Sequence, residues 1–243
     1  MATFDYFSDL LPDPDNKIND AGVTDSTGSA GPGFAKVRFK SNNVDVQSSR
    51  TRSGRGVSAS PDSHFWEFDI VYNPLTREEF DPVSCFIEYR RGSFLPFYVI
   101  LPQHNAPKDV TFKAFATANT IRVDGSYFAG DTSITIDSTS SISGDPKPGD
   151  FFTISDPTDT NHTKAYKIVR VETPTTYQTG LPVSAGTRRI HTMPSLVRDV
   201  ADNSVINFIN PMFRVQLRSP VFEYDLDSEN LYQFSLSLEE IQP

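Results

Sequence analysis

The stretch NLYQFSLSLEE, residues 230–240, constrains the fold of this 243-residue chain more than any other. Its large apolar side chains alternate with polar ones and so lie on one side of an extended strand; they are Tyr232, Phe234, Leu236 and Leu238. A strand with one apolar face needs other strands to pair with and a core to cover. The chain must therefore bring earlier strands to its C-terminal end.

The first hundred residues supply candidate partner strands at 37–39, 65–72 and 94–101. In the second of these, alternation places one set of side chains on a single face: Trp66, Phe68, Ile70 and Tyr72. We therefore predict a discontinuous domain made of residues 1–108 plus 219–243, with residues 109–218 inserted as a second domain.

One helix is expected in the first domain, over residues 76–90. Thr76 and Glu79 match a capping box, and Gly92 suits the left-handed position just past a helix end. Apolar side chains follow at helical spacing: Phe80, Val83, Phe86 and Ile87. Pro82 removes one helical hydrogen bond and predicts a kink or a restart.

Residues 109–218 contain short alternating runs such as TSITIDS, FFTIS and KAYKIVRVET, separated by turn-rich spacers such as GDPKPGD. This spacing indicates a small β-barrel or sandwich, with a single helical turn expected at 196–202. The predicted fold class is mainly β: a discontinuous β-sandwich domain with one helix, plus an inserted small β-barrel or sandwich domain.

A polar segment, residues 41–63, reads as a long exposed loop and holds three arginines, Arg50, Arg52 and Arg55. One interpretation is a contact arm that grips an acidic neighbour, because the chain carries a net charge of −9. The other interpretation is an ordinary solvated loop. The negative charge argues against an arm that grips nucleic acid, but suits a surface along which DNA passes without binding.

The sequence lacks the motifs of common catalytic, cofactor and metal sites, including HExxH, CxxC, GxSxG and the P-loop. We expect no cofactor, no metal and no enzymatic activity. Glu78/Glu79 and Glu239/Glu240 could serve a glycosidase, but a helix cap and a strand end explain them better. The single cysteine, Cys85, is interpreted as a small buried residue. No apolar run is long enough to predict a membrane span, and the acidic N-terminus lacks a signal-peptide pattern, so synthesis in a cytosol is expected.

Several stretches, in this order along the chain, resemble distal tail proteins and other minor tail proteins of long-tailed bacteriophages and gene transfer agents. The first is FWEFDIVY followed by PLTREEFDPVSCFIEYRRGSFLPFYVILP. The others are GDTSITIDS, PGDFFTIS and KAYKIVRV, and then FEYDLDSENLYQFSLSLEE. The resemblance is weaker over the first 60 residues.

The resemblance implies a structural virion protein at the tail tip, assembled in the host cytoplasm. Copies of the chain would form a ring, typically a hexamer, that joins the tail tube protein to a baseplate hub or receptor-binding proteins. DNA would pass through its channel. The discontinuous domain would form the ring, and the inserted domain would lie outside it.

Two alternatives come from other classes of function. A carbohydrate-binding or host-adhesion module would use aromatic side chains of the inserted domain, and the candidates are Tyr127, Phe128, Tyr166 and Tyr177. A glycan hydrolase would need two carboxylates that converge in a cleft. Within the tail-protein class, another minor tail or tube-end protein is the main competitor.

Overall fold

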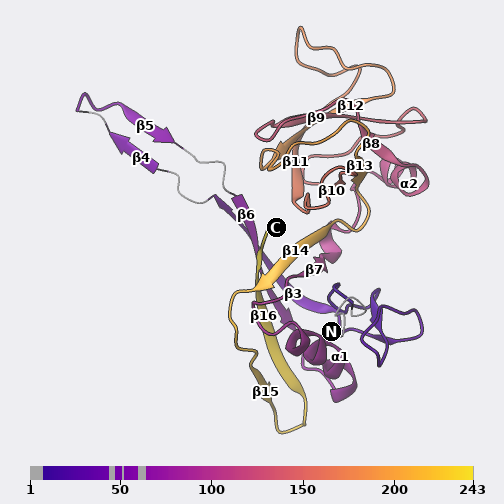
Figure 1. Ribbon diagram of the computed structural model, residues 1–243, viewed down its shortest axis with the longest axis vertical. Coiled ribbons are helices and arrows are strands. Elements are labelled where there is room, and N and C mark those ends of the chain that lie inside the picture. The colour runs from indigo at the N-terminus through magenta and orange to yellow at the C-terminus, as the bar shows by residue number, and fades with distance from the viewer. Residues whose placement is uncertain (1–7, 44–46, 51, 60–63, 243) are drawn as a thin grey trace. The chain divides into compact units, whose positions relative to one another are not determined.

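The structure is a computed structural model that describes residues 8–43, 47–50, 52–59 and 64–242 (Figure 1). Its fold is mainly β, as the sequence predicts, with two α-helices and several separate sheets in these ranges. One sheet is curled into a half-barrel and another closes into a barrel.

The chain folds into two compact units. The first comprises Met1–Val99 and Arg214–Ile241, and the second comprises Ile100–Phe213 with the last two residues. The boundaries expected from the sequence, 108/109 and 218/219, lie a few residues further along the chain.

Contacts on either side explain where the units divide. The ring of His104 packs on Phe151 with centroids 4.6 Å apart, and the N–H of Lys108 donates to Asp150, so residues before 109 already belong to the second unit. Val215 and the residues after it pair with the C-terminal strand of the first unit.

The first unit is built on one curled sheet. Its strands lie in the order β3 (Phe34–Asn43), β6 (His64–Tyr72), β16 (Tyr232–Glu240), β14 (Met212–Leu217) and β7 (Phe97–Ile100), and β15 (Tyr224–Leu226) pairs with β16. The C-terminal strand β16 is thus an inner strand, antiparallel to both β6 and β14. This confirms that the early strands provide the sheet that β16 needs.

The predicted alternation sets the core of this unit. All four side chains of one β6 face are buried, and so are three of the β16 face: Trp66, Phe68, Ile70, Tyr72, Phe234, Leu236 and Leu238. Tyr72 stacks on Phe234 across the two strands, with ring centroids 4.4 Å apart.

Helix α1 (Arg77–Tyr89) lies against this sheet through its apolar face. The ring of Phe80 stacks on Tyr232 with centroids 4.3 Å apart, and Phe86 contacts Phe97 of β7 edge-on. The capping box is confirmed, because the Glu79 carboxylate accepts from the backbone N–H of Thr76 at 3.0 Å.

The sequence predicts a kink or a restart at Pro82; the structure has no restart, because α1 continues through this residue. After its C-cap residue, Arg90, two residues have positive φ, Arg91 at 54° and Gly92 at 66°. Gly92 is needed there, since a Cβ would lie 2.8 Å from the carbonyl oxygen of Pro220.

The N-terminal segment covers one edge of the sheet. Tyr98 of β7 donates its N–H to Asp9 at 2.7 Å and accepts from Leu11 at 2.9 Å. Short strands β1 (Lys17–Ile18) and β2 (Ser29–Ala30) then pair with each other. The other edge, β3, pairs with β6 on one side and with no other strand of the described chain.

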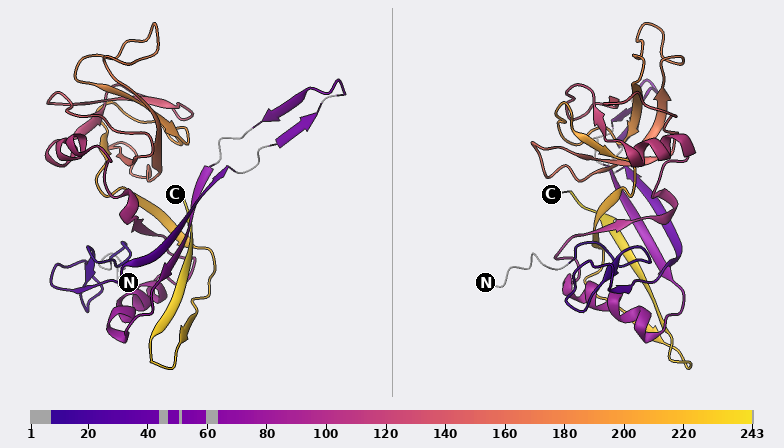
Figure 2. Two further views of the ribbon diagram at one scale, coloured as in Figure 1. Left: turned by 180° about the vertical axis from the view of Figure 1, so that it is seen from behind. Right: turned by 90° about the vertical axis from the view of Figure 1, so that its right-hand side faces the viewer.

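The second unit is a closed barrel. Its strands lie in the order β10 (Phe151–Ser155), β11 (Ala165–Glu172), β12 (Arg188–Met193), β9 (Ser133–Ser138), β8 (Ile121–Val123) and β13 (Val205–Asn207), seen from two further sides in Figure 2. Its core is aromatic and branched-aliphatic: Phe112, Ile134, Ile136, Phe152, Tyr166, Ile168, Ile190, Ile206 and Phe208. Closure leaves no free strand edge in the barrel.

Two helical features of this unit differ from the sequence predictions. Helix α2 (Val110–Ala118) was not expected; the carboxylate of Asp109 caps it by accepting from the N–H of Phe112 at 2.8 Å. Residues 196–202 are not helical, so the helical turn predicted there is wrong. A short 3₁₀ helix, η2 (Pro102–His104), precedes α2.

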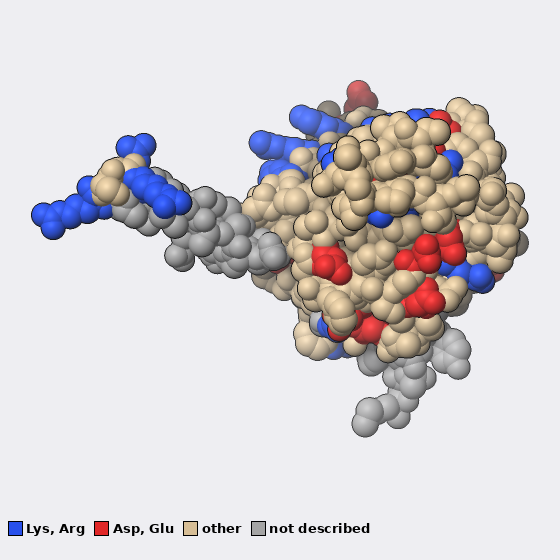
Figure 3. Space-filling model, turned by 90° about the horizontal axis from the view of Figure 1, so that it is seen from above, with Lys and Arg blue, Asp and Glu red and all other residues tan. Residues whose placement is uncertain are grey.

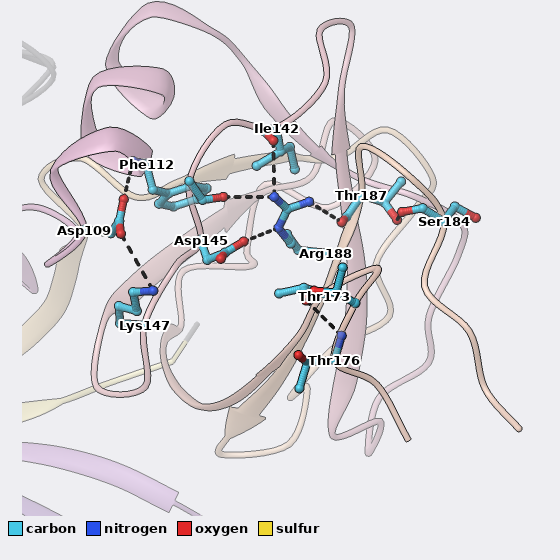
Figure 4. A network of polar contacts seen from close by, with 12 residues as sticks. Asp109, Phe112, Ile142, Asp145, Lys147, Thr173, Thr176, Ser184, Thr187 and Arg188 are labelled. Atoms are coloured by element: carbon cyan, nitrogen blue, oxygen red, sulfur yellow. Dashed lines mark hydrogen bonds and ion pairs between the residues drawn. The ribbon is translucent and has the colours of Figure 1, made fainter. Parts of the chain in front are cut away.

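Arg188 fastens the long β9–β10 connection to the barrel (Figure 4). Its guanidinium pairs with Asp145 and donates to the carbonyl oxygens of Gly144 at 3.1 Å and Ile142 at 3.3 Å. Arginine's fixed fork of donors suits this bridging of several acceptors, so we interpret the cluster as structural.

Candidate functional site

The polar segment that the sequence predicts as a loop contains a β-hairpin. Strands β4 (Gln47–Arg50) and β5 (Gly56–Ala59) pair antiparallel, with Gln47 opposite Ala59 and Arg50 opposite Gly56. Among the described strands, β4 and β5 pair only with each other. We call this hairpin, residues 47–50 and 52–59, the arm.

The arm presents all three candidate contact arginines at one end. Arg50, Arg52 and Arg55 are exposed and lie in or beside its turn. Figure 3 shows basic side chains gathered at the tip of the arm. The structure therefore brings these three residues together, which their spacing in sequence alone did not establish.

Within the described chain, the arm has no third strand. An isolated two-stranded hairpin is at best marginally stable in water, and a third strand or a packed face normally stabilises it. The three positively charged arginines at the tip also repel one another, and acidic groups on a partner surface would reduce this repulsion. The missing third strand favours a partner in general, and the arginines favour a partner surface that is negatively charged.

A groove of about 510 Å³ on the first unit has such a surface. It lies between α1 and residues 8–29, and we call it the acidic groove. Acidic and apolar side chains line it together, namely Ile18, Asp20, Glu78, Asp81, Cys85 and Tyr89. Within the described chain, no lysine or arginine is among its lining residues.

Helical spacing explains one wall of the acidic groove. Phe80, Val83 and Ile87 face the sheet, which leaves the opposite side of α1 to the groove. Cys85 lies on that side and is exposed, so the interpretation of it as a buried residue is wrong. The period of 3.6 residues could have shown this from the sequence.

Hydrogen bonds hold the other wall. The Asn19 side chain accepts from the N–H groups of Ala21 at 3.0 Å and Val23 at 3.1 Å, which fixes the turn that carries Asp20. The buried guanidinium of Arg90 donates to the carbonyl oxygen of Ser8 and so ties this wall to the end of α1.

Two of the candidate glycan contacts in the barrel are engaged in packing. Tyr166 is 0% exposed, and its hydroxyl bonds to His162 at 2.8 Å and accepts from the N–H of Val197 at 3.1 Å. It cannot stack on a sugar, so its assignment as a glycan contact is wrong. Tyr127 is half-buried, with its hydroxyl bonded to Asp124 and Thr135.

The other two, Phe128 and Tyr177, are exposed by 71% and 44% but lie at opposite ends of the barrel. Phe128 lies in the β8–β9 loop, near the paired residues Ser133 and His191. Tyr177 lies in the β11–β12 loop, beyond the pair Glu172 and Arg189 at the other end. The structure does not bring the four aromatics together.

Three carboxylates of the described chain, Glu172, Glu239 and Glu79, have structural explanations. The buried carboxylate of Glu172 pairs with Arg170 at 2.8 Å, Arg189 at 3.0 Å and His191 at 3.1 Å, and the hydrogen bonds from His191 and Arg189 outweigh burial to lower its pKa. Glu239 accepts from Gln216 and Glu79 caps α1, as expected for a strand end and a cap.

No group of three or more His, Cys, Asp or Glu in the described ranges is placed to hold a metal ion. The helices found among the described residues are too short or too polar to cross a membrane. Comparison of the sequence with protein-family models finds no matching family, and comparison with curated proteins finds no significant match.

Proposed function

We propose that this protein is a structural component of a bacteriophage tail tip, a distal tail protein whose copies form a ring. The ring, a hexamer by resemblance, joins the tail tube protein to the baseplate hub or receptor-binding proteins, and DNA passes through it without specific binding. The protein is assembled in the host cytoplasm and resides in the virion. It performs no catalysis and uses no cofactor.

The arm is the observation that carries this proposal. It is a two-stranded ribbon with an arginine tip and no third strand in the described chain, so its stabilising partner is expected in another molecule. The open edge of β3 next to it supports the same conclusion, because unpaired strand edges readily pair with a neighbour. A hairpin that reaches from one copy to a different surface of the next makes a head-to-tail contact, and such contacts form a ring when the rotation between copies closes.

The proposal is tested by removing the arm without disturbing the sheet. Asn43 and His64 are directly paired, so an Asn-Gly turn that replaces residues 44–63 closes the β3–β6 ladder. We expect rings for the wild type by negative-stain electron microscopy and light scattering, and monomers for the shortened variant. Buried Trp66, the single tryptophan, reports by its fluorescence that the variant is folded.

A wild-type protein that stays monomeric at high concentration and does not join tail tubes contradicts the proposal. Arg52→Lys is the matched control, since it keeps the charge at the tip and should assemble as the wild type does.

Host adhesion by the barrel is a second candidate role, favoured by the way Phe128 is presented. The N–H groups of Phe128 and Ala129 donate to the carboxylates of Asp131 and Asp199 at 2.8 and 2.9 Å, and that of Gly130 donates to Leu196 at 2.7 Å. A fixed loop thus exposes one aromatic ring. Binding on a glycan array that Phe128→Ala abolishes supports this role, and silence of the wild type removes it.

A further inference from the structure

The acidic groove and the arm have complementary chemistry. The groove offers Asp20, Glu78 and Asp81 together with the ring of Tyr89, and the arm offers arginines. Guanidinium groups pair with carboxylates and stack on aromatic rings, and the acidic groove offers both kinds of partner to an arginine. The carboxylate of Asp81 already lies 3.3 Å from Arg77, but this pair is exposed and therefore weak.

The arm and the acidic groove are connected to opposite ends of the β3–β6 ladder. The groove adjoins α1 and residues 8–29, which are connected to the Phe34–Tyr72 end of the β3–β6 ladder. The arm continues from the Asn43–His64 end (Figure 1). The ladder from Phe34 to Asn43 is about 30 Å long, so the two surfaces are attached about that far apart along it.

We propose that the arginine tip of the arm docks in the acidic groove of a neighbouring copy of this chain. This inference rests on the ring proposed above and names the two surfaces that meet in it. Each copy gives one arm and receives another at a different surface, so the contact is heterologous and repeats around a closed ring. The occupant of the groove is a second copy because the complementary charges belong to this same sequence.

A charge exchange tests the pairing. Arg50→Glu with Arg52→Glu makes the arm acidic, and Asp20→Lys with Asp81→Lys makes the groove basic. Each pair alone should raise the concentration needed for assembly by about tenfold or more, because like charges then face each other. All four substitutions in one chain restore complementarity and should return assembly towards the wild-type concentration.

Glu223→Lys with Asp225→Lys is the matched control. These acids are exposed and outside the groove lining, so their reversal gives the same change in net charge. We expect it to leave assembly near the wild-type concentration. An equal loss in this control overturns the proposal, since net charge and not the groove would then set assembly.

Cys85 gives a second, independent measurement, because it is the only cysteine and is exposed in the groove. Oxidation of Arg52→Cys should link arms to neighbouring grooves and give a ladder of covalent oligomers on a non-reducing gel. Adding Cys85→Ser should reduce the ladder to dimers that join two arms. Alkylation of wild-type Cys85 should be slower in rings than in dilute monomers.

The two proposals fail in different ways. If the wild type forms no ring, the proposed function fails. Suppose instead that the wild type forms rings, that the chain with all four substitutions does not regain assembly, and that no ladder of covalent oligomers appears. The proposed function then stands, and the docking of the arm in the acidic groove is wrong. A covalent link that leaves the chain monomeric on the gel shows docking within one chain and also overturns the inference.

Discussion

Asp156, which follows β10, shows how one residue holds two loops of the barrel together. Its carboxylate accepts from the N–H and hydroxyl of Thr158 at 2.7 and 2.6 Å, and from the N–H of Ala201 at 2.8 Å. Burial alone would raise its pKa, but these hydrogen bonds outweigh burial and lower the pKa to about 2. Because the unfolded value is ~3.9, the ionised group stabilises the fold above pH ~4, and the stabilisation is lost as pH falls through about 2.

Asp156→Asn should therefore reduce the free energy of unfolding of the barrel by about 2 kcal/mol near neutral pH. The difference from the wild type should shrink as the pH falls from ~4 to ~2, since the wild type loses the same contribution there. Urea unfolding followed by circular dichroism at several pH values measures both. Asp124→Asn, at an exposed carboxylate, is the control, and a difference that is constant with pH would contradict this account.

The exposure of two single residues, Cys85 and Tyr166, shows what sequence patterns can and cannot predict. The exposure of Cys85 follows from helical spacing once α1 is placed, so that error was avoidable. The burial of Tyr166 was not readable, because β11 has neighbours on both sides in a closed barrel and His162 satisfies the hydroxyl from outside the strand. The closing of the sheet into a barrel decides which aromatic side chains are buried inside it, and a local sequence pattern does not encode this closure.

At the scale of elements, α1 depends on one aromatic contact. Phe80 is 3% exposed and packs among Phe222, Tyr224, Tyr232 and Phe234. Phe80→Ala should lower the free energy of unfolding of the first unit by ~3–5 kcal/mol, through lost burial and the cavity left behind. Guanidinium unfolding followed by Trp66 fluorescence measures it, since this single tryptophan lies in that unit.

Phe94→Ala is the control for Phe80→Ala, because Phe94 is 72% exposed and its loss should change stability by less than ~0.5 kcal/mol. A similar, small effect at both positions would mean that α1 does not depend on the aromatic cluster.

Elements with a strict period were predictable, and the others were not. β16 alternates over its whole length and β6 over most of its length because one face covers a core, and α1 has both a capping box and an apolar stripe. Helix α2 was missed because VTFKAFATA is rich in β-branched residues and buries only Phe112 fully. The sequence predicts a loop where the arm lies, because QSSR and GVSA show no apolar period that would indicate strands.

For the whole molecule, the connection between the units follows from two neighbouring strands. β7 and β14 are adjacent in the sheet of the first unit, and the side chains of Tyr98 and Arg214 interact where the chain leaves and returns. The barrel is thus an insertion between two strands that pair without it. The arm and the acidic groove both belong to the first unit, so assembly should not require the barrel.

Joining Ile100 to Met212 through a short turn removes the barrel and tests whether assembly requires only the first unit. We expect the shortened chain to form rings at about the wild-type concentration, because it keeps both docking surfaces. Residues 100–213 expressed alone should be a folded monomer, since a closed barrel has no free edge to pair. Electron microscopy and light scattering measure assembly, Trp66 fluorescence checks the folding of the shortened chain, and circular dichroism checks that of residues 100–213, which contain no tryptophan. A shortened chain that is folded but monomeric would place part of the ring contact in the barrel and contradict the assignment of assembly to the first unit.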